Sequence, residues 1–207
     1  MQRPVSGGLL SAGDCGVWHT PSLVPDSQAY YPSFMKSTKA ILFCDCHHFS
    51  RLQLAIGDRI LEFMDSFYRE CGECLVSKGG RIIKYLGDSI LAVFPQGSAN
   101  DVIDAAHCLR REYAELVAAL GTGIESDMEV GISYGEVFEG TVGHDTLRAY
   151  DVFGECVNEA AMIGHHRGIA ITESVHQLIS PEIAVRPLET QHPKWRTDPL
   201  IVWEVVE

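Results

Sequence analysis

The chain has 207 residues, with 16 Lys and Arg against 28 Asp and Glu, so its formal net charge is -12. Its 46% hydrophobic fraction is enough for a packed core, and its length fits one domain with an additional tail. The acidic balance disfavours a general nucleic-acid or anionic-membrane binder, because phosphate groups demand an excess of Lys and Arg.

The sequence contains no segment that predicts insertion into a membrane. No stretch approaches the roughly 20 apolar residues that span a bilayer, and the N-terminus lacks the apolar region of a secretory signal. The seven cysteines are an odd number without regular spacing. We therefore expect reduced thiols and a cytoplasmic location.

Residues 1–36 mix Gly, Ser, Pro and Tyr without periodicity and predict a flexible arm, with one folded domain over residues 37–207. The apolar run Ala40–Cys46 predicts a central strand that is buried on both faces. A long amphipathic helix is then predicted by apolar residues at steps of three and four. These residues are Leu52, Ile56, Ile60, Phe63, Phe67, Cys71 and Cys74.

The middle and C-terminal thirds alternate between strand and helix patterns. Segments 81–86 and 89–94 flank Gly87-Asp88 and predict a hairpin. A second helix follows, with apolar residues from Val102 to Leu120 on one face. Residues 128–135 and 136–143 predict another strand pair. A short helix from about Glu155 to His165 and further strands complete the set. This order predicts an α+β, ferredoxin-like (split βαβ) fold with extra strands.

The stretch FCDCHHFS at residues 43–50 has the composition of a zinc site. In a strand, however, Cys44 and Cys46 share one face and Asp45 occupies the other, whereas zinc needs four converging ligands. The only other close pair, Cys71 and Cys74, lies on the predicted helix. We favour a strand that presents Asp45, with a zinc-binding module as the alternative.

Asp88 is a second exposed carboxylate, in the turn of the predicted hairpin. A strand end and an adjacent turn are neighbours in a split βαβ sheet, so Asp45 and Asp88 could together hold Mg²⁺ or Mn²⁺. Alternatively Asp88 is only a turn residue, since Gly-Asp favours turns.

Three blocks of the sequence resemble the catalytic domain of class III nucleotidyl cyclases, the adenylyl and guanylyl cyclase family. They are KAILFCDCHHFSRL, GGRIIKYLGDSILAVFP, and VGISYGEVFEGTVG followed by YDVFGECVNEAA, within residues 38–180. The resemblance implies a homodimer with two shared sites. It implies conversion of a nucleoside triphosphate to a 3′,5′-cyclic nucleotide and pyrophosphate. The GG[DE]EF turn of the related diguanylate cyclases is absent, since the turn here is YLGDS.

The resemblance assigns catalytic roles by position. Asp45 and Asp88 match the two metal-binding aspartates, and the carbonyl of Cys46 matches a backbone metal ligand, for two Mg²⁺ or Mn²⁺ ions. Asn158 matches the asparagine that orients the ribose and the transition state.

The resemblance also assigns substrate contacts. Lys84 and Asp151 match the pair that reads the base. In the family, backbone amides just after the first strand contact the substrate phosphates. The matching amides here are those of His48, Phe49 and Ser50. In the family, one subunit contributes the metal aspartates and the other contributes the base-reading pair and the asparagine.

Three positions depart from the family pattern. Met162 stands where the family has an arginine that stabilises phosphoryl charge, and Arg167 is the nearest cation that could replace it. His48 stands where a glycine is usual. The triphosphate lysine has no clear match, with Lys194 and Arg196 as candidates.

The identity of the base stays open at this stage. Lys84 and Asp151 favour ATP over GTP but do not exclude CTP. In these departures and in the absence of a sensor segment, the chain resembles bacterial pyrimidine cyclases, which make cCMP or cUMP in anti-phage defence. We therefore favour a pyrimidine cyclase slightly over an adenylyl cyclase that makes cAMP. A catalytically weak or inactive pseudo-cyclase is the third alternative, which Met162 supports.

Overall fold

The computed structural model describes residues 34–206. The arm expected at residues 1–36 therefore lies almost entirely outside the described residues. Within these residues, no helix is both long enough and apolar enough to cross a membrane.

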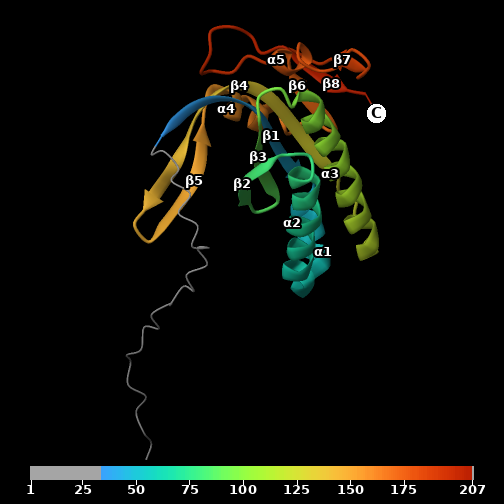
Figure 1. Ribbon diagram of the computed structural model, residues 1–207. Helices are drawn as coiled ribbons and strands as arrows, with labels where there is room; N and C mark the ends of the chain where they lie inside the picture. The colour runs from blue at the N-terminus through green and yellow to red at the C-terminus, as the bar shows by residue number, and fades with distance from the viewer. Residues whose placement is uncertain (1–33, 207) are drawn as a thin grey trace, which may run out of the picture. The chain divides into compact units, whose positions relative to one another are not determined.

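The fold is a mixed α+β arrangement built on one open sheet (Figure 1). The strands are β1 (Met35–Cys46), β2 (Arg81–Leu86), β3 (Ser89–Phe94), β4 (Met128–His144), β5 (Leu147–Phe153), β6 (Ile169–Thr172), β7 (Val185–Pro187) and β8 (Val202–Val205). Their order is β2-β3-β1-β4-β6-β8-β7, and β5 pairs with β4 outside this path. The first four strands have the order of a split βαβ unit, which confirms the predicted fold class.

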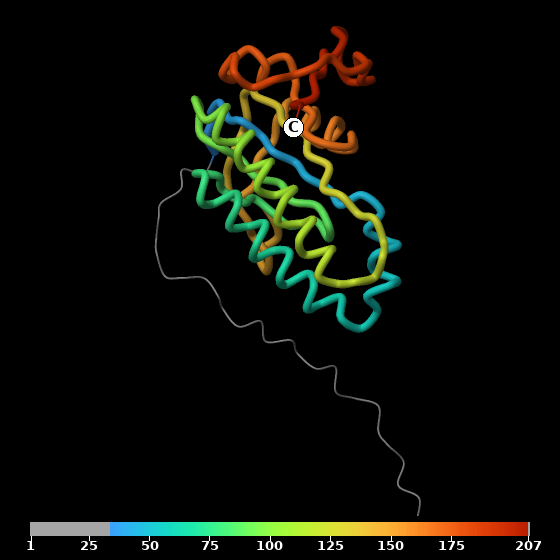
Figure 2. The backbone as a smooth tube through the Cα atoms, turned by 90° about the vertical axis from the view of Figure 1, so that its right-hand side faces the viewer, coloured from blue at the N-terminus to red at the C-terminus, as the bar shows by residue number. Residues whose placement is uncertain are grey.

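The helices lie on both sides of this sheet. They are α1 (Phe49–Ile56), α2 (Ile60–Val76), α3 (Ala99–Leu120), α4 (Glu155–Ile163) and the single turn α5 (Glu173–His176). Helices α2 and α3 run antiparallel, side by side, along one face (Figures 1 and 2). Their buried side chains form the main core together with the inward residues of β1.

Strand β1 separates two apolar layers, because its side chains alternate between the faces. Leu42, Cys44 and Cys46 are buried in the core beneath α2 and α3. Ile41 and Phe43 instead join a smaller cluster, which includes residues of α4. The predicted central strand is confirmed, although it begins five residues earlier than the run that predicted it.

The single long helix predicted after β1 is wrong in one respect, because the chain forms two helices there. Gly57 has a φ of 58° and ends α1, and a 3₁₀ turn over Gly57–Arg59 leads into α2. Leu52, Ile56 and the predicted apolar residues of α2 are nevertheless buried or packed on the core. The three- and four-residue spacing of apolar side chains thus continues across the break between the two helices. Only the backbone conformation of Gly57 reveals this break.

The hairpin predicted within residues 128–143 is also wrong. Gly135 does not turn the chain, and β4 runs straight through it as one 17-residue strand. The actual hairpin joins β4 to β5 at residues 145–146, with His144 paired to Leu147. β4 stays extended because β1 pairs with it continuously, from Cys46 opposite Met128 to Met35 opposite Glu139.

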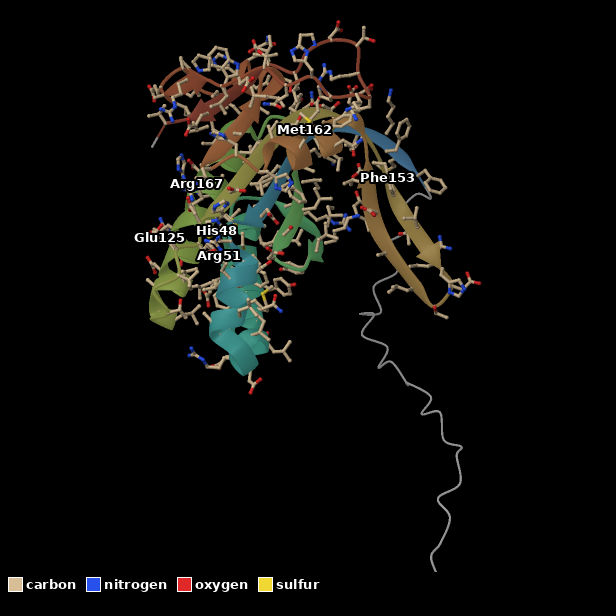
Figure 3. All side chains as sticks on the ribbon, turned by 180° about the vertical axis from the view of Figure 1, so that it is seen from behind. His48, Arg51, Glu125, Phe153, Met162 and Arg167 are labelled. Atoms are coloured by element: carbon tan, nitrogen blue, oxygen red, sulfur yellow. A yellow bond between two sulfur atoms is a disulfide. The ribbon has the colours of Figure 1, made fainter. Side chains whose placement is uncertain are left out.

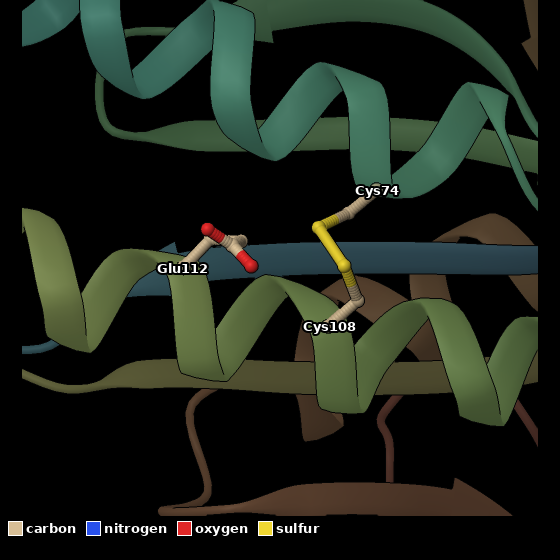
Figure 4. Close-up of side chains that lie close together, drawn as sticks. All are labelled: Cys74, Cys108 and Glu112. Carbon is tan, nitrogen blue, oxygen red and sulfur yellow. A yellow bond between two sulfur atoms is a disulfide. The ribbon is translucent and has the colours of Figure 1, made fainter.

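The expectation that the cysteines are reduced thiols is wrong for two of them. Cys74 on α2 and Cys108 on α3 form a disulfide between the two helices (Figure 4). Side-by-side packing brings their Cα atoms to 5.6 Å, within the range that a disulfide spans. A sequence separation of 34 gave no signal of this pairing. Within the described part of the chain, the free cysteines are Cys44, Cys46, Cys71 and Cys156.

Helix α4 lies very close to β4, and two glycines make this possible. A Cβ at Gly131 would lie 2.1 Å from the carbonyl oxygen of Ala160 and 2.5 Å from the amide nitrogen of Gly164. Both contacts are with backbone atoms, which cannot rotate away as a side chain can. Gly131 therefore sets how closely α4 approaches the sheet.

We predict that Gly131→Ala lowers the free energy of unfolding by roughly 1–3 kcal/mol, because the added methyl group forces α4 away from β4. The matched control is Gly135→Ala on the same strand, whose Cβ would meet only Cys156, at 3.1 Å. Urea unfolding of both variants measures the difference. Equal stability of the two variants would contradict the proposed contact.

Candidate active site

The C-terminal end of β1 and the β2–β3 turn meet at the edge of the sheet. Ser89 donates a hydrogen bond to Oδ1 of Asp45, and Cys46 Sγ donates one to the carbonyl oxygen of Asp88 at 3.2 Å. Burial raises the pKa of Asp88, and the charge of Asp45 raises it further. The structure thus brings Asp45, Cys46 and Asp88 together, as the sequence predicted.

The two cysteines of FCDCHHFS do not converge with its polar residues. Cys44 and Cys46 are buried in the core, whereas the half-buried Asp45 lies on the opposite face of β1. Burial raises the pKa of both thiols far above the ordinary value, which disfavours the thiolate that zinc requires. No candidate metal cluster among residues 34–206 contains either cysteine.

Lys84 on β2 and Asp151 on β5 form a direct ion pair. Lys84 Nζ lies 2.6 Å from Asp151 Oδ2, and the two side chains are 36% and 18% exposed. The Asp151 side chain also accepts a hydrogen bond from the amide of Val152 at 2.8 Å, which fixes the carboxylate. The two residues matched to base recognition are therefore adjacent in one subunit, and both remain accessible to solvent.

Asn158 and Met162 lie one turn apart on α4. Asn158 is exposed, but Met162 is half-buried and packs against an apolar cluster that includes Leu200 and Val202. Met162 also lines a pocket of about 380 Å³ between α4 and the C-terminal segment. The position where the family has an arginine is thus occupied here by a packing residue.

The candidate phosphate-binding segment begins at His48, which has a φ of 61°. Among the described residues, it is the only residue other than glycine with a positive φ. The usual glycine therefore corresponds to a left-handed backbone position, which His48 adopts at a steric cost. Its ring lies against that of His47, with centroids 3.8 Å apart.

The N-terminus of α1 follows directly at Phe49 and Ser50. His48 caps this helix without a side-chain hydrogen bond, so no side chain occupies the amides of the first turn at that position. Free amides at a helix N-terminus favour anions. The backbone here is thus suited to the phosphate contact that the resemblance implied.

No sequence pattern indicated Glu129, although it lies beside Asp45. The register of β1 and β4 places the two residues directly opposite each other, so their side chains share a face of the sheet. Glu129 is 4% exposed, and burial raises its pKa. Only the pairing of two strands more than 80 positions apart reveals this neighbour.

His47 connects Glu129 to Arg167. Its Nδ1 lies 2.8 Å from Glu129 Oε1, and its Nε2 lies 3.2 Å from Nη2 of Arg167. A guanidinium can only donate, so Nε2 accepts and Nδ1 carries the proton that is shared with Glu129. Arg167, the nearest cation in sequence that could replace the missing arginine, is thus engaged with His47.

Arg196 also forms ion pairs within the chain. It bonds to Glu159 and lies 3.6 Å from Glu155, both on α4. The Arg196 side chain, which is 24% exposed, holds the C-terminal loop against α4. The structure records no such contact for Lys194.

Two clusters among the described residues have enough donor atoms for a metal ion. One contains Cys74, Cys108 and Glu112, but its sulfur atoms form the disulfide and cannot act as thiolates (Figure 4). The other consists of Asp45, Glu129 and His165. Two carboxylates that share a face, next to the Asp88 turn, form an oxygen-rich donor set that fits a hard divalent cation.

The sequence model of the family described as the adenylate and guanylate cyclase catalytic domain matches residues 33–194. An adenylate cyclase from Anabaena cylindrica is 30% identical over 152 residues, which are 68% of this chain and 30% of that protein. The chain spans less than a third of the length of the curated relatives that it matches first.

Solved structures share the fold. The adenylyl cyclase CyaB from P. aeruginosa has a TM-score of 0.75 at 22% identity, with 84% of this chain and 96% of that chain covered. The guanylyl cyclase Cya2 has a TM-score of 0.76 at 22% identity, with 84% and 93% covered. At this identity the likeness establishes a shared fold.

We predict that His48→Gly keeps or raises the free energy of unfolding, by up to about 1 kcal/mol, because glycine adopts a positive φ without strain. His48→Val should lower it, because a β-branched residue tolerates this backbone poorly. Thermal unfolding of both variants provides the comparison. A valine variant as stable as the glycine variant would show that the left-handed backbone is not a constraint.

Proposed function

The chain belongs to the family of adenylate and guanylate cyclase catalytic domains, and from this premise we propose that it is a metal-dependent nucleotidyl cyclase. The ribose 3′-oxygen of a nucleoside triphosphate attacks the α-phosphorus, a cyclic phosphodiester forms, and pyrophosphate leaves. The observation that carries the proposal is the closure of the Asp88 turn on Asp45. This closure places two carboxylates together at the sheet edge. Both carboxylates belong to sequence blocks that resemble motifs of the family.

Asp45 and Asp88, with the carbonyl of Cys46, are the groups that would hold Mg²⁺ or Mn²⁺. When bound, two such ions neutralise the triphosphate and make the 3′-hydroxyl a better nucleophile. The hydrogen bond from Ser89 fixes one oxygen of Asp45, so the carboxylate is already oriented. In a chain of net charge -12, these positions depend strongly on divalent cations to accept a polyanion.

The phosphates are proposed to lie at the start of α1. Amides from His48 to Ser50 can donate to phosphate oxygens there, and the helix dipole favours negative charge at this end. Asn158 is proposed to hold the ribose, because an exposed amide on α4 can donate to the sugar and accept from it.

We propose ATP as the substrate, ahead of CTP and UTP. Lys84 can donate to N1 of adenine and Asp151 can accept from its amino group, and the 2.6 Å pair holds both at one place. The curated relatives are named as adenylate cyclases. The preference for a pyrimidine rested on the expected absence of a sensor segment and on the departures at His48 and Met162. Each of these two residues has a local packing or backbone explanation.

Two subunits are proposed to build each site. Lys84 and Asp151 pair through β2 and β5, whereas Asp45 lies at the end of β1 and Asn158 on α4. In the family these groups meet across a dimer. Exposed apolar side chains on the β4–β5 hairpin could contribute to such an interface, among them Phe138, Leu147 and Phe153 (Figure 3).

The test of the activity is product formation from each of ATP, GTP, CTP and UTP with Mn²⁺, read by mass spectrometry. We expect cyclic AMP from ATP, and a fall of roughly 10²–10³-fold in Asp45→Asn, which keeps the side-chain shape but loses the charge. Cyclic CMP or UMP instead would assign a pyrimidine cyclase. No cyclic product from any of the four would identify a pseudo-cyclase.

The shared site predicts complementation between two inactive variants. Asp45→Asn and Asn158→Ala each damage both sites of a homodimer, but a mixed dimer has one intact site. An equal mixture should therefore regain about one quarter of the wild-type activity, since half of the dimers are mixed. The control is the mixture of Asp45→Asn with Asp88→Asn, which restores no site. Equal activity in the two mixtures would argue against sites shared between subunits.

A further inference from the structure

Asp45, Glu129 and His165 meet at one end of the sheet, and Glu129 and His165 have no role in the proposed function so far. One donor atom of each side chain lies within 4.8 Å of the others. We propose that Glu129 and His165 join Asp45 as side-chain ligands of one of the two divalent cations, so that this metal site contains an imidazole nitrogen. This deepens the proposed function and rests on it for the presence of a metal.

The backbone brings the two carboxylates together. Asp45 and Glu129 are directly opposite in the antiparallel register of β1 and β4, on the face that α4 covers. Like charges in such a cross-strand pair destabilise a sheet. Glu129 is also almost fully buried, so water cannot screen it well. A cation between the two carboxylates removes this penalty.

Neighbouring groups hold each carboxylate from the side. Ser89 bonds to Oδ1 of Asp45, and His47 bonds to Oε1 of Glu129. His47 is itself fixed by Arg167. Polar neighbours that orient ligands in this way are typical of metal sites.

His165 supplies the third donor from a different element. It lies just after Gly164, which caps the end of α4, and its Nδ1 lies 3.7 Å from Oδ2 of Asp45. Its ring packs edge-on against Phe43, with centroids 6.4 Å apart, which limits its orientation. Two ligands bound at about 2.1 Å to one ion are at most about 4.2 Å apart, so small rotations suffice to close the cluster.

The donor set predicts which cation is preferred. Mg²⁺ takes oxygen ligands, whereas an imidazole nitrogen suits transition metals better. A site with two carboxylates and one imidazole should therefore bind Mn²⁺ more tightly than Mg²⁺. Loss of His165 should weaken Mn²⁺ binding more than Mg²⁺ binding.

The test is pulsed electron paramagnetic resonance of the full chain with Mn²⁺ alone, together with calorimetric titration of Mn²⁺ and Mg²⁺. We expect a nitrogen coupling to Mn²⁺ in the wild type, which is lost in His165→Gln with an affinity roughly ten- to a hundredfold weaker. Glu129→Gln should weaken both cations. The matched control is His166→Gln, because His166 instead faces Glu204, at 3.8 Å, and should keep the nitrogen coupling.

Two results would overturn the inference: bound Mn²⁺ without nitrogen coupling in the wild type, or a coupling that persists in His165→Gln. Neither depends on turnover, so the two proposals fail separately. Cyclic product without nitrogen coupling would refute the ligand set but keep the cyclase. Nitrogen-coupled Mn²⁺ without any cyclic product would keep the ligand set and refute the cyclase.

Discussion

The antiparallel pairing of β1 with β4 is the constraint on which the rest of the molecule depends. It runs without interruption from Met35 to Cys46 and keeps β4 extended past Gly135, where the sequence alone suggested a turn. Because side chains alternate along a strand, this register decides which of them face the core and which face the site. It places Cys44 and Cys46 in the core and leaves Asp45 beside Glu129.

Charged side chains are distributed unevenly around the paired strands β1 and β4. Asp45, Glu129 and Asp88 concentrate negative charge at one end of the sheet, and both Asp88 and Glu129 have raised pKa values because they are partly removed from water. Lys84 and Asp151, by contrast, compensate each other. In the proposed function, the first group would need cations before a triphosphate approaches, whereas the second would present a donor and an acceptor without net charge. This division matches the two tasks of a cyclase site: binding metal and reading a base.

The departures from the family pattern have physical explanations in the packing. His48 occupies a left-handed position and its ring lies against that of His47, so its bulk is accommodated next to the amides that are proposed to bind phosphate. Met162 belongs to an apolar cluster between α4 and the C-terminal strands. The cations near that end of the molecule are committed elsewhere, Arg167 to His47 and Arg196 to Glu159. Both arginines that could have supplied the missing positive charge therefore already have partners within the chain.

The sequence by itself determined the α+β class, the central strand, the β2–β3 hairpin and the faces of α2 and α3, because these follow from local periodicity and turn residues. It also located Asp45 and Asp88 at a strand end and an adjacent turn, where a split βαβ sheet brings them together. Only the tertiary structure decided the break at Gly57, the straight course of β4, the Cys74–Cys108 disulfide and the position of Glu129 and His165. The course of β4, the disulfide and the cluster depend on strand register or helix packing between residues distant in the chain, which no local pattern of side chains encodes. The break at Gly57 depends on a local backbone angle, which the apolar periodicity does not reveal.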